Sequence, residues 1–264
     1  MMKNQPNIRA FSFTEALVVV VSIMILTGIT VASFSRAKEY ARITRCLSNL
    51  HRLSQAALQY AQNNQGAYPS DDRTSRSCWY PEIRAYNANI AANSLCPDAN
   101  HPSGGVGTAS KAWGGPKFAA SKLSVQFPWL TGTASSYGLN GDMTKRDGLD
   151  QKFMGRDKFK ASNFNAASGG PSAGVAPSEP LFVDAIWVDG SPQRSDAVPQ
   201  SLRYGDANLS KKDQMGIFCI NRHFGRVNVS FADGSGFTIP LAQLWQLKWN
   251  ASYQPRNVVV PVTW

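Results

Sequence analysis

The feature that most constrains this chain is a long apolar run near its amino terminus, residues 11–35, which reads FSFTEALVVVVSIMILTGITVASFS. The run carries a single charge, Glu15, and residues 16–35 carry none. As a helix with a rise of about 1.5 Å per residue, the uncharged part would extend about 30 Å, the thickness of a bilayer core. The run therefore predicts a transmembrane or assembly helix.

Two general explanations compete for such a run. A secretory signal peptide has an apolar region of about 7–15 residues that ends in a small-residue cleavage site, whereas this run is longer and continues into a polar helical pattern. An ordinary membrane anchor explains the length but not Glu15, because a carboxylate at the edge of a membrane span is costly and usually has a partner. Both explanations leave part of the sequence unexplained.

The junction of Ala10 and Phe11, followed by Ser-Phe-Thr-Glu, resembles the processing site of type IV pilins and type II secretion pseudopilins. The resemblance implies that a prepilin peptidase cuts before Phe11 and that Phe11 is then N-methylated. It also implies that Glu15 faces the terminal amine of a neighbouring subunit during assembly. Opposite charges in a low-dielectric setting interact more strongly than in water. The chain departs from the family at Ala10, where glycine is usual.

The helical pattern continues beyond residue 35 without a breaker. Apolar residues recur there at steps of three and four, which predicts an amphipathic helix; they are Ile43, Leu47, Leu50, Leu53, Ala57, Leu58 and Ala61. The sequence Asn-Asn-Gln-Gly at residues 63–66 then supplies a stop. We expect one helix from Phe11 to about Asn63, apolar on all sides in its first half and amphipathic in its second.

A second motif lies near the carboxyl end, where His223 is followed by nine residues and then by Asp233 and Gly234. This spacing resembles the H-x9-DG domain of pilin-like proteins from planctomycete- and verrucomicrobia-type bacteria. Further landmarks of that family occur in the same order: residues 45–60, Leu95-Cys96-Pro97, the SYGLN sequence at residues 136–140, and a strand with Asp184 and Trp187. The resemblance therefore covers nearly the whole chain.

The residues of this motif also have a direct physical interpretation. Residues 227–231 and 236–239 favour strands, and Asp233-Gly234 between them suits a tight turn with positive φ. His223 precedes the hairpin, and we expect it to hydrogen-bond either Asp233 or Asp184 and so hold the end of the strand. A ligand or metal role for His223 is the alternative.

The chain has four cysteines, Cys46, Cys78, Cys96 and Cys219, and no CxxC spacing, which argues against a zinc ribbon. Four cysteines allow three pairings, and spacing cannot choose among them. In an exported domain a disulfide is permitted, and Cys78 with Cys96 is the best candidate pair because both lie in the same loop-rich region. Cys46 lies on the predicted helix, where it could be a small buried apolar residue.

Composition and motifs give no sign of an enzyme or of a cofactor. The net charge is +10, and the excess of basic residues is scattered along the chain. None of the three histidines lies in an HExxH motif, and the sequence contains no GxSxG elbow or phosphate-binding loop. We therefore expect no catalytic site. Because some major pseudopilins bind calcium in a carboxy-terminal loop, Asp184 and Asp233 remain candidate calcium ligands.

These features predict an α+β, pilin-like fold in which a long amino-terminal helix, with a membrane half and an amphipathic half, packs on a small antiparallel sheet with long irregular loops. The expected organisation is a prepilin leader at residues 1–10, a transmembrane and assembly helix at 11–35, its amphipathic continuation at 36–66, and an exported, β-rich globular domain at 67–264 that contains the H-x9-DG motif.

The resemblance implies a structural subunit of a type II secretion pseudopilus or a type IV pilus-like filament. Its partners would be copies of itself, other pilin-like subunits, the prepilin peptidase, an inner-membrane assembly platform and membrane lipid. It would be a single-pass inner-membrane protein with a periplasmic carboxy-terminal domain, or part of an extracellular filament. The alternative is a membrane-anchored exported module that never polymerises and binds polysaccharide or DNA.

Overall fold

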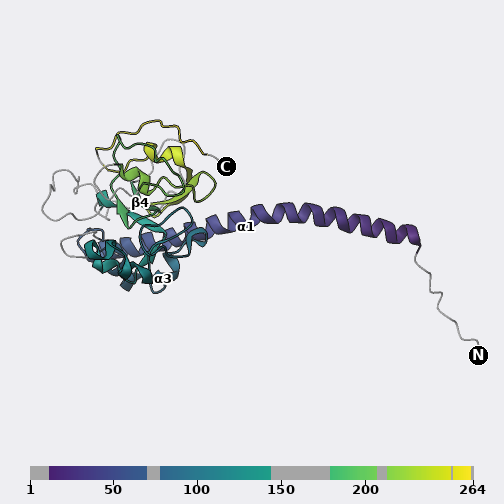
Figure 1. Cartoon of the computed structure of the whole chain (residues 1–264), viewed down its shortest axis with the longest axis horizontal. Coiled ribbons are helices and arrows are strands. Elements are labelled where there is room, and N and C mark those ends of the chain that lie inside the picture. Colours follow the sequence, from purple (N-terminus) through teal and green to yellow (C-terminus); the bar gives the residue numbers. More distant parts are fainter. Residues whose placement is uncertain (1–11, 70–77, 144–178, 207–212, 251, 263–264) are drawn as a thin grey trace, which may run out of the picture. The chain divides into compact units, whose positions relative to one another are not determined.

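The computed structural model describes residues 12–69, 78–143, 179–206, 213–250 and 252–262 (Figure 1). The chain divides into two compact units, Met1–Ala41 and Arg42–Trp264. The boundary between them falls inside helix α1, which spans Phe13–Asn63. The predicted processing junction of Ala10 and Phe11 lies outside the described residues.

Helix α1 ends at Asn63, where the sequence predicts its stop. Gln65 and Gly66 follow with positive φ angles of 56° and 82°. The Gly66 N–H donates to the Ala61 carbonyl at 2.8 Å and so satisfies one of the last free carbonyls of the helix. The prediction of this helix end is therefore confirmed.

The predicted membrane half of the helix is wrong. Among the residues that the structure describes, no helix combines the length and the hydrophobicity needed to cross a bilayer. The side chains of the apolar stretch are described over residues 13–28. It also contains four polar residues, Thr14, Glu15, Ser22 and Thr27.

The second unit is built on a five-stranded sheet with the strand order β5-β3-β4-β6-β7. Its strands are β3 (Tyr137–Asn140), β4 (Pro180–Asp184), β5 (Asp189–Gly190), β6 (Arg226–Phe231) and β7 (Gly236–Pro240). Three neighbouring pairs are antiparallel, whereas β3 and β5 are parallel. Two further short strands, β1 (Trp113–Gly114) and β2 (Ala134–Ser135), form a second sheet. The predicted single antiparallel sheet is thus corrected to a mixed sheet and a smaller one.

The parallel pair arises because the chain leaves β4, crosses over β3 and pairs with its other edge. The crossing segment passes very close to Gly138 in β3. A side-chain carbon at Gly138 would lie 2.6 Å from the Trp187 carbonyl oxygen and 2.8 Å from the Ala185 Cβ. The glycine of the SYGLN sequence is therefore required by this crossing.

The part of α1 that belongs to the second unit packs on this sheet. Its inward side chains, among them Leu50, Leu53 and Ala57, are fully buried. The Ser54 hydroxyl donates to the Ser230 hydroxyl on β6 at 2.7 Å, between two residues that are both buried. The amphipathic stripe that the sequence predicts here is the face that covers the sheet.

Several short elements complete the unit: α2 (Trp79–Glu82), η1 (Arg84–Tyr86), α3 (Ile90–Asn93), η2 (Pro97–Ala99), η3 (Pro116–Ala120), α4 (Leu123–Gln126), η4 (Pro128–Leu130), η5 (Gly141–Met143), η8 (Gln214–Ile217) and η9 (Leu241–Gln246). Residues 216–221 form no strand, because Gly216 and Ile217 close the 3-10 helix η8 and no strand follows before β6. Ile217, Phe218 and Ile220 are buried, so their β-favouring composition reflects burial. The hairpin strands around Asp233-Gly234 are confirmed.

Candidate functional site: an exposed helix surface and a buried polar cluster

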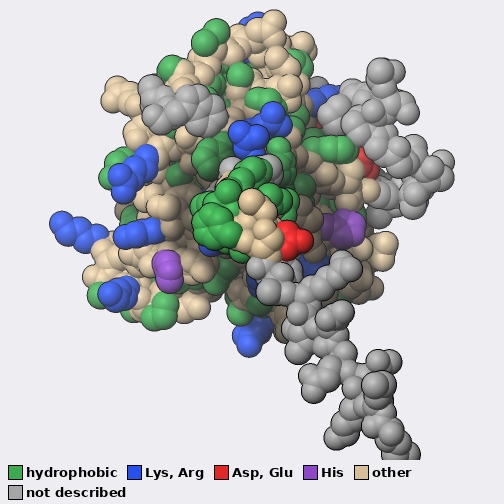
Figure 2. All heavy atoms as spheres, turned by 90° about the vertical axis from the view of Figure 1, so that its right-hand side faces the viewer, with side chains coloured by type: hydrophobic (Ala, Val, Ile, Leu, Met, Phe, Trp, Pro, Cys, Tyr) green, Lys and Arg blue, Asp and Glu red, His purple; other side chains and the backbone are tan. Residues whose placement is uncertain are grey.

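The first candidate site is the surface of α1 over residues 13–28. Its large hydrophobic side chains are exposed, from 43% at Val21 to 81% at Phe13. The set comprises Phe13, Leu17, Val18, Val19, Val20, Val21, Ile23, Met24, Ile25 and Leu26. Figure 2 shows a group of hydrophobic side chains with an acidic side chain at its edge. Because soluble monomers rarely expose a contiguous apolar patch of this kind, such a surface marks an interaction site.

Glu15 has a role within the single chain that the sequence analysis missed. Its carboxylate accepts the backbone N–H of Ser12 at 2.9 Å, which is half of a capping box at the start of α1. The signal for it was the S-x-x-E spacing of Ser12 and Glu15. The predicted assembly partner of Glu15, the amine of Phe11, lies outside the described residues, so that role stays a prediction.

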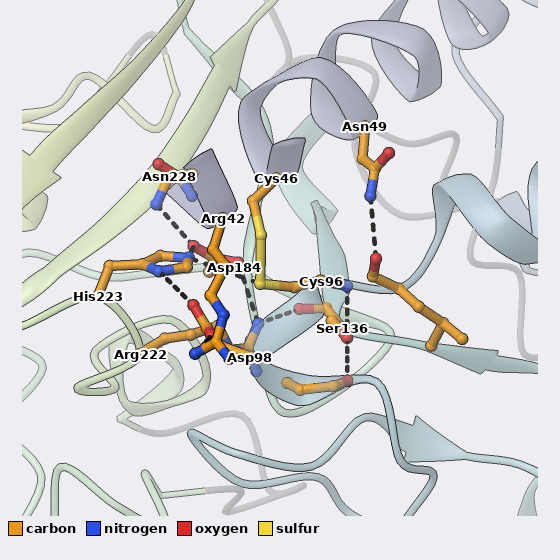
Figure 3. Close-up of a disulfide and its surroundings, with 12 residues drawn as sticks. Arg42, Cys46, Asn49, Cys96, Asp98, Ser136, Asp184, Arg222, His223 and Asn228 are labelled. Atoms are coloured by element: carbon orange, nitrogen blue, oxygen red, sulfur yellow. Dashed lines mark hydrogen bonds and ion pairs between the residues drawn. A yellow bond between two sulfur atoms is a disulfide. The ribbon is translucent and has the colours of Figure 1, made fainter. Parts of the chain in front are cut away.

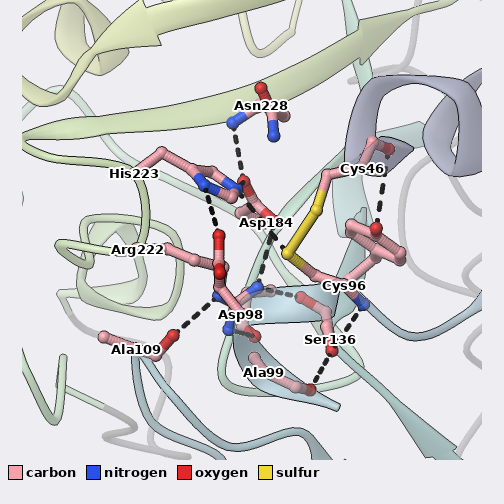
Figure 4. Close-up of polar contacts among 12 residues, drawn as sticks. Cys46, Cys96, Asp98, Ala99, Ala109, Ser136, Asp184, Arg222, His223 and Asn228 are labelled. Carbon is pink, nitrogen blue, oxygen red and sulfur yellow. Dashed lines mark hydrogen bonds and ion pairs between the residues drawn. A yellow bond between two sulfur atoms is a disulfide. The ribbon is translucent and has the colours of Figure 1, made fainter. Parts of the chain in front are cut away.

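The second candidate site is a buried polar cluster around His223 (Figure 4). The His223 side chain has no exposed surface, and its two ring nitrogens face two carboxylates. Nδ1 lies 3.1 Å from Asp98 Oδ2, and Nε2 lies 3.3 Å from Asp184 Oδ2. Of the two partners that the sequence left open, Asp184 is confirmed, and Asp98 is a partner that it did not foresee.

The Asp233-Gly234 half of the motif forms the turn of the β6–β7 hairpin. Gly234 has a φ of +81°, as a tight turn of this kind demands. The Asp233 carboxylate accepts the Ser235 N–H at 2.8 Å, and His51 Nδ1 on α1 lies 3.0 Å from the Gly234 carbonyl oxygen. The two halves of the motif therefore hold opposite ends of strand β6.

Arg222 is a further residue of the cluster that the sequence did not predict. Its side chain has no exposed surface, and its Nη1 lies 3.1 Å from Asp184 Oδ1. The remaining N–H groups donate to four backbone carbonyls, those of Thr108, Ala109, Ser136 and Ala185. All five guanidinium donors are thus used, and one side chain ties β4 to two loops that are distant in sequence.

The charges of the cluster stabilise one another. Burial by itself lowers the pKa of His223, but the nearby charge and hydrogen bonds of Asp184, together with Asp98, outweigh burial and raise the pKa to about 9. Burial likewise raises the pKa of Asp184, but the charges of His223 and Arg222 outweigh it, and the pKa lies below its usual value. Both groups are therefore charged at neutral pH.

A disulfide borders the cluster, and it joins Cys46 to Cys96, with their Cα atoms 5.2 Å apart (Figure 3). The predicted pair of Cys78 and Cys96 is wrong. Helix α1 reaches the Cys96 segment, where the Asn49 side chain donates to the Leu95 carbonyl at 2.9 Å. Cys78 and Cys219 are buried outside the disulfide. Closeness in sequence did not predict closeness in space.

The cluster approaches the surface at Asp98. The Asp98 side chain is 13% exposed and pairs with Arg42 of α1 at 3.0 Å, and the Arg42 side chain is 41% exposed. By contrast, the side chains of Asp184, Arg222 and His223 have no exposed surface. The histidine therefore contacts protein groups and not solvent, an arrangement that positions strands and loops.

The two candidate calcium ligands do not lie together. Asp184 accepts the Asn228 N–H at 2.7 Å near the start of β6, whereas Asp233 follows the end of that strand. The five steps along the chain from Asn228 to Asp233 correspond to about 16 Å of extended backbone. Calcium binding by this pair stays an untested prediction. Ligand atoms do converge at Cys46, Cys96 and His223, where they all lie within 4.8 Å of one another.

Comparisons of the chain with family models, with curated proteins and with solved structures found no match.

Proposed function

We propose that the chain is a structural subunit of a pilin-like filament, which assembles by packing residues 13–28 of α1 against the same helix of other copies. The observation that carries the proposal is the exposure of the apolar side chains there, such as Phe13 at 81% and Val18 at 63%. Burial of apolar surface is worth about 25 cal/mol per Å², so a helix of this kind gains stability by association.

A second copy suits this surface better than hydrocarbon does. Glu15 lies among the apolar side chains and is exposed in the single chain. A carboxylate in apolar surroundings needs a charged or hydrogen-bonding partner, and lipid tails offer none. A neighbouring subunit cut before Phe11 would bring an amino-terminal charge to that position, as the resemblance to pilins implies.

The proposal extends to processing and location. We propose that a prepilin peptidase cuts between Ala10 and Phe11, and that the globular unit is exported and carried by a type II secretion pseudopilus or a type IV pilus-like filament. The disulfide between Cys46 and Cys96 supports export, because disulfides persist in oxidising compartments and are rare in the cytosol.

A matched pair of lysine substitutions tests the proposal. Val18→Lys places a charge on the proposed assembly surface, where Val18 is 63% exposed, and Val259→Lys places one on a more exposed valine of the globular unit, at 88%. In the native host we expect Val18→Lys to abolish filaments seen by electron microscopy, and Val259→Lys to leave them intact. Both variants should keep the wild-type melting temperature.

Normal filaments from Val18→Lys would contradict the proposal. A wild-type chain that stays monomeric in the host and binds DNA with a strong salt dependence would instead favour the non-polymerising binding module. On the face that Figure 2 shows, however, Lys and Arg side chains lie in several separate places.

A further inference from the structure

The disulfide and His223 form a set of soft metal ligands that no motif announces. The Sγ atoms of Cys46 and Cys96 and a ring nitrogen of His223 lie within 4.8 Å of one another, and all three residues are buried. The ligands come from three segments that are far apart in sequence. For this reason no short motif such as CxxC marks them in the sequence.

Two distances to His223 Nε2 match those of a tetrahedral site. Zinc binds thiolate sulfur at about 2.3 Å and imidazole nitrogen at about 2.0–2.1 Å, so a tetrahedral ion separates S and N by about 3.5 Å and N and O by about 3.3 Å. In the structure, Cys96 Sγ lies 3.6 Å from His223 Nε2, and Asp184 Oδ2 lies 3.3 Å from the same nitrogen. Asp184 therefore supplies the carboxylate oxygen that faces the same nitrogen.

The surroundings supply the supporting contacts that metal ligands need. A metal-bound histidine usually donates its other ring N–H to a carboxylate, which fixes the ring. His223 Nδ1 lies 3.1 Å from Asp98 Oδ2, in the position for this contact. The second oxygen of Asp184, Oδ1, is held by Arg222 at 3.1 Å, so only Oδ2 faces the histidine.

From this geometry we infer that Cys46, Cys96 and His223 bind one thiophilic divalent ion such as Zn²⁺ when the disulfide is reduced. The disulfide and the metal are alternative states of the same cluster. In one state a covalent S–S bond joins α1 to the Cys96 segment, and in the other the ion joins them. The inference is independent of filament assembly.

Reduction converts one state into the other. An external reductant, either a dithiol or a phosphine together with water, supplies two electrons and two protons. The Cys46–Cys96 bond breaks, and the dithiol becomes a disulfide or the phosphine becomes its oxide. The ion then displaces one proton from each cysteine thiol and the proton from His223 Nε2. The proton on Nδ1 stays on the ring and is donated to the Asp98 carboxylate. The exposed edge of the cluster, at Asp98 and Arg42, is the side from which the ion enters.

Cobalt is the probe for this site, because thiolate-bound tetrahedral Co²⁺ gives a charge-transfer band in the near ultraviolet and strong visible bands. The full-length chain is titrated with Co²⁺ under anaerobic conditions, once with the disulfide intact and once after reduction with a phosphine. We expect one Co²⁺ per reduced chain, displaced by an equivalent of Zn²⁺, and no such spectrum from the oxidised chain.

Cysteine variants locate the binding site. Cys96→Ser should lose the charge-transfer band, whereas Cys78→Ser and Cys219→Ser remove buried cysteines outside the cluster and should keep it. A reduced chain without the band would overturn the inference, as would the same band from a chain that lacks both Cys46 and Cys96.

Folding is followed in the same samples through the near-ultraviolet circular dichroism of the buried tryptophans. If reduction alone weakens this signal, the cobalt titration should restore it, since metal binding is then coupled to folding. A reduced chain that loses the signal and does not regain it with Co²⁺ would also overturn the inference.

Discussion

The two ends of helix α1 have opposite environments, although both are helical and both carry apolar residues. Residues 13–28 are apolar on nearly every side and exposed, whereas the end of the helix in the second unit has fewer apolar residues and buries them, including Leu50 and Leu53 at 0% exposure. The two ends differ in which surface covers their apolar side chains. The second end finds its partner in its own chain, and we propose that the first end finds it in other copies.

The largest expected effect on the free energy of unfolding comes from replacing Arg222, whose side chain is fully buried. Arg222→Met keeps much of the side-chain volume but leaves Asp184 without its guanidinium and removes one donor from each of four backbone carbonyls. Loss of one partner of a buried ion pair costs about 3–5 kcal/mol. Urea unfolding should show this loss, and Arg203→Met, at an exposed arginine, should change stability by less than about 0.5 kcal/mol.

A matched pair of leucine substitutions tests the difference between the two ends of α1. Leu50→Ala removes a fully buried side chain of α1, and Leu17→Ala removes one that is 54% exposed on the same helix. We expect Leu50→Ala to lower the free energy of unfolding by about 2–5 kcal/mol and Leu17→Ala to leave it nearly unchanged while weakening assembly. Equal losses of stability from the two substitutions would show that the first end already has a partner within the chain.

The third prediction concerns pH. His223 binds its proton more tightly in the folded chain, with a pKa of about 9 against 6.5 for the free side chain, because Asp184 and Asp98 outweigh both burial and Arg222. This contribution to stability is complete below pH 6.5 and is lost as the pH rises through about 9. The disulfide-bonded, metal-free chain should therefore lose stability across this window, by an amount on the order of a few kcal/mol.

The control for the pH prediction is His223→Gln. This variant removes the titrating group and should flatten the slope of stability between pH 6.5 and 9, although its stability at lower pH is reduced. Chemical unfolding at a series of pH values measures both chains. An unchanged slope in the variant would assign the pH dependence to a group other than His223.

Sequence patterns predicted the local features of this chain well. The stop of α1 after Asn63, the Asp233-Gly234 turn and the strands beside it depend on residues close together in sequence. The contact of His223 with Asp184 was one of two stated alternatives. These features were predictable because short-range backbone preferences decide them.

The features that sequence patterns missed depend on which distant segments meet. The pairing of Cys46 with Cys96, the contacts of Arg222 and the parallel alignment of β3 with β5 all join parts of the chain that only the tertiary fold brings together. The prediction for residues 13–28 failed for a different reason. An apolar pattern indicates that a surface must be covered but does not identify what covers it. The membrane-spanning segment was predicted from that pattern alone.

The charge of Glu15 gives the most direct test of the account. Glu15→Gln keeps an oxygen that can accept the Ser12 N–H and so preserves the helix cap, but it removes the negative charge. The account predicts that a Glu15→Gln chain keeps its helix content and the fold of its globular unit but forms no filaments in the native host. Filaments of wild-type number and length from Glu15→Gln would contradict it and would leave Glu15 as a helix cap only.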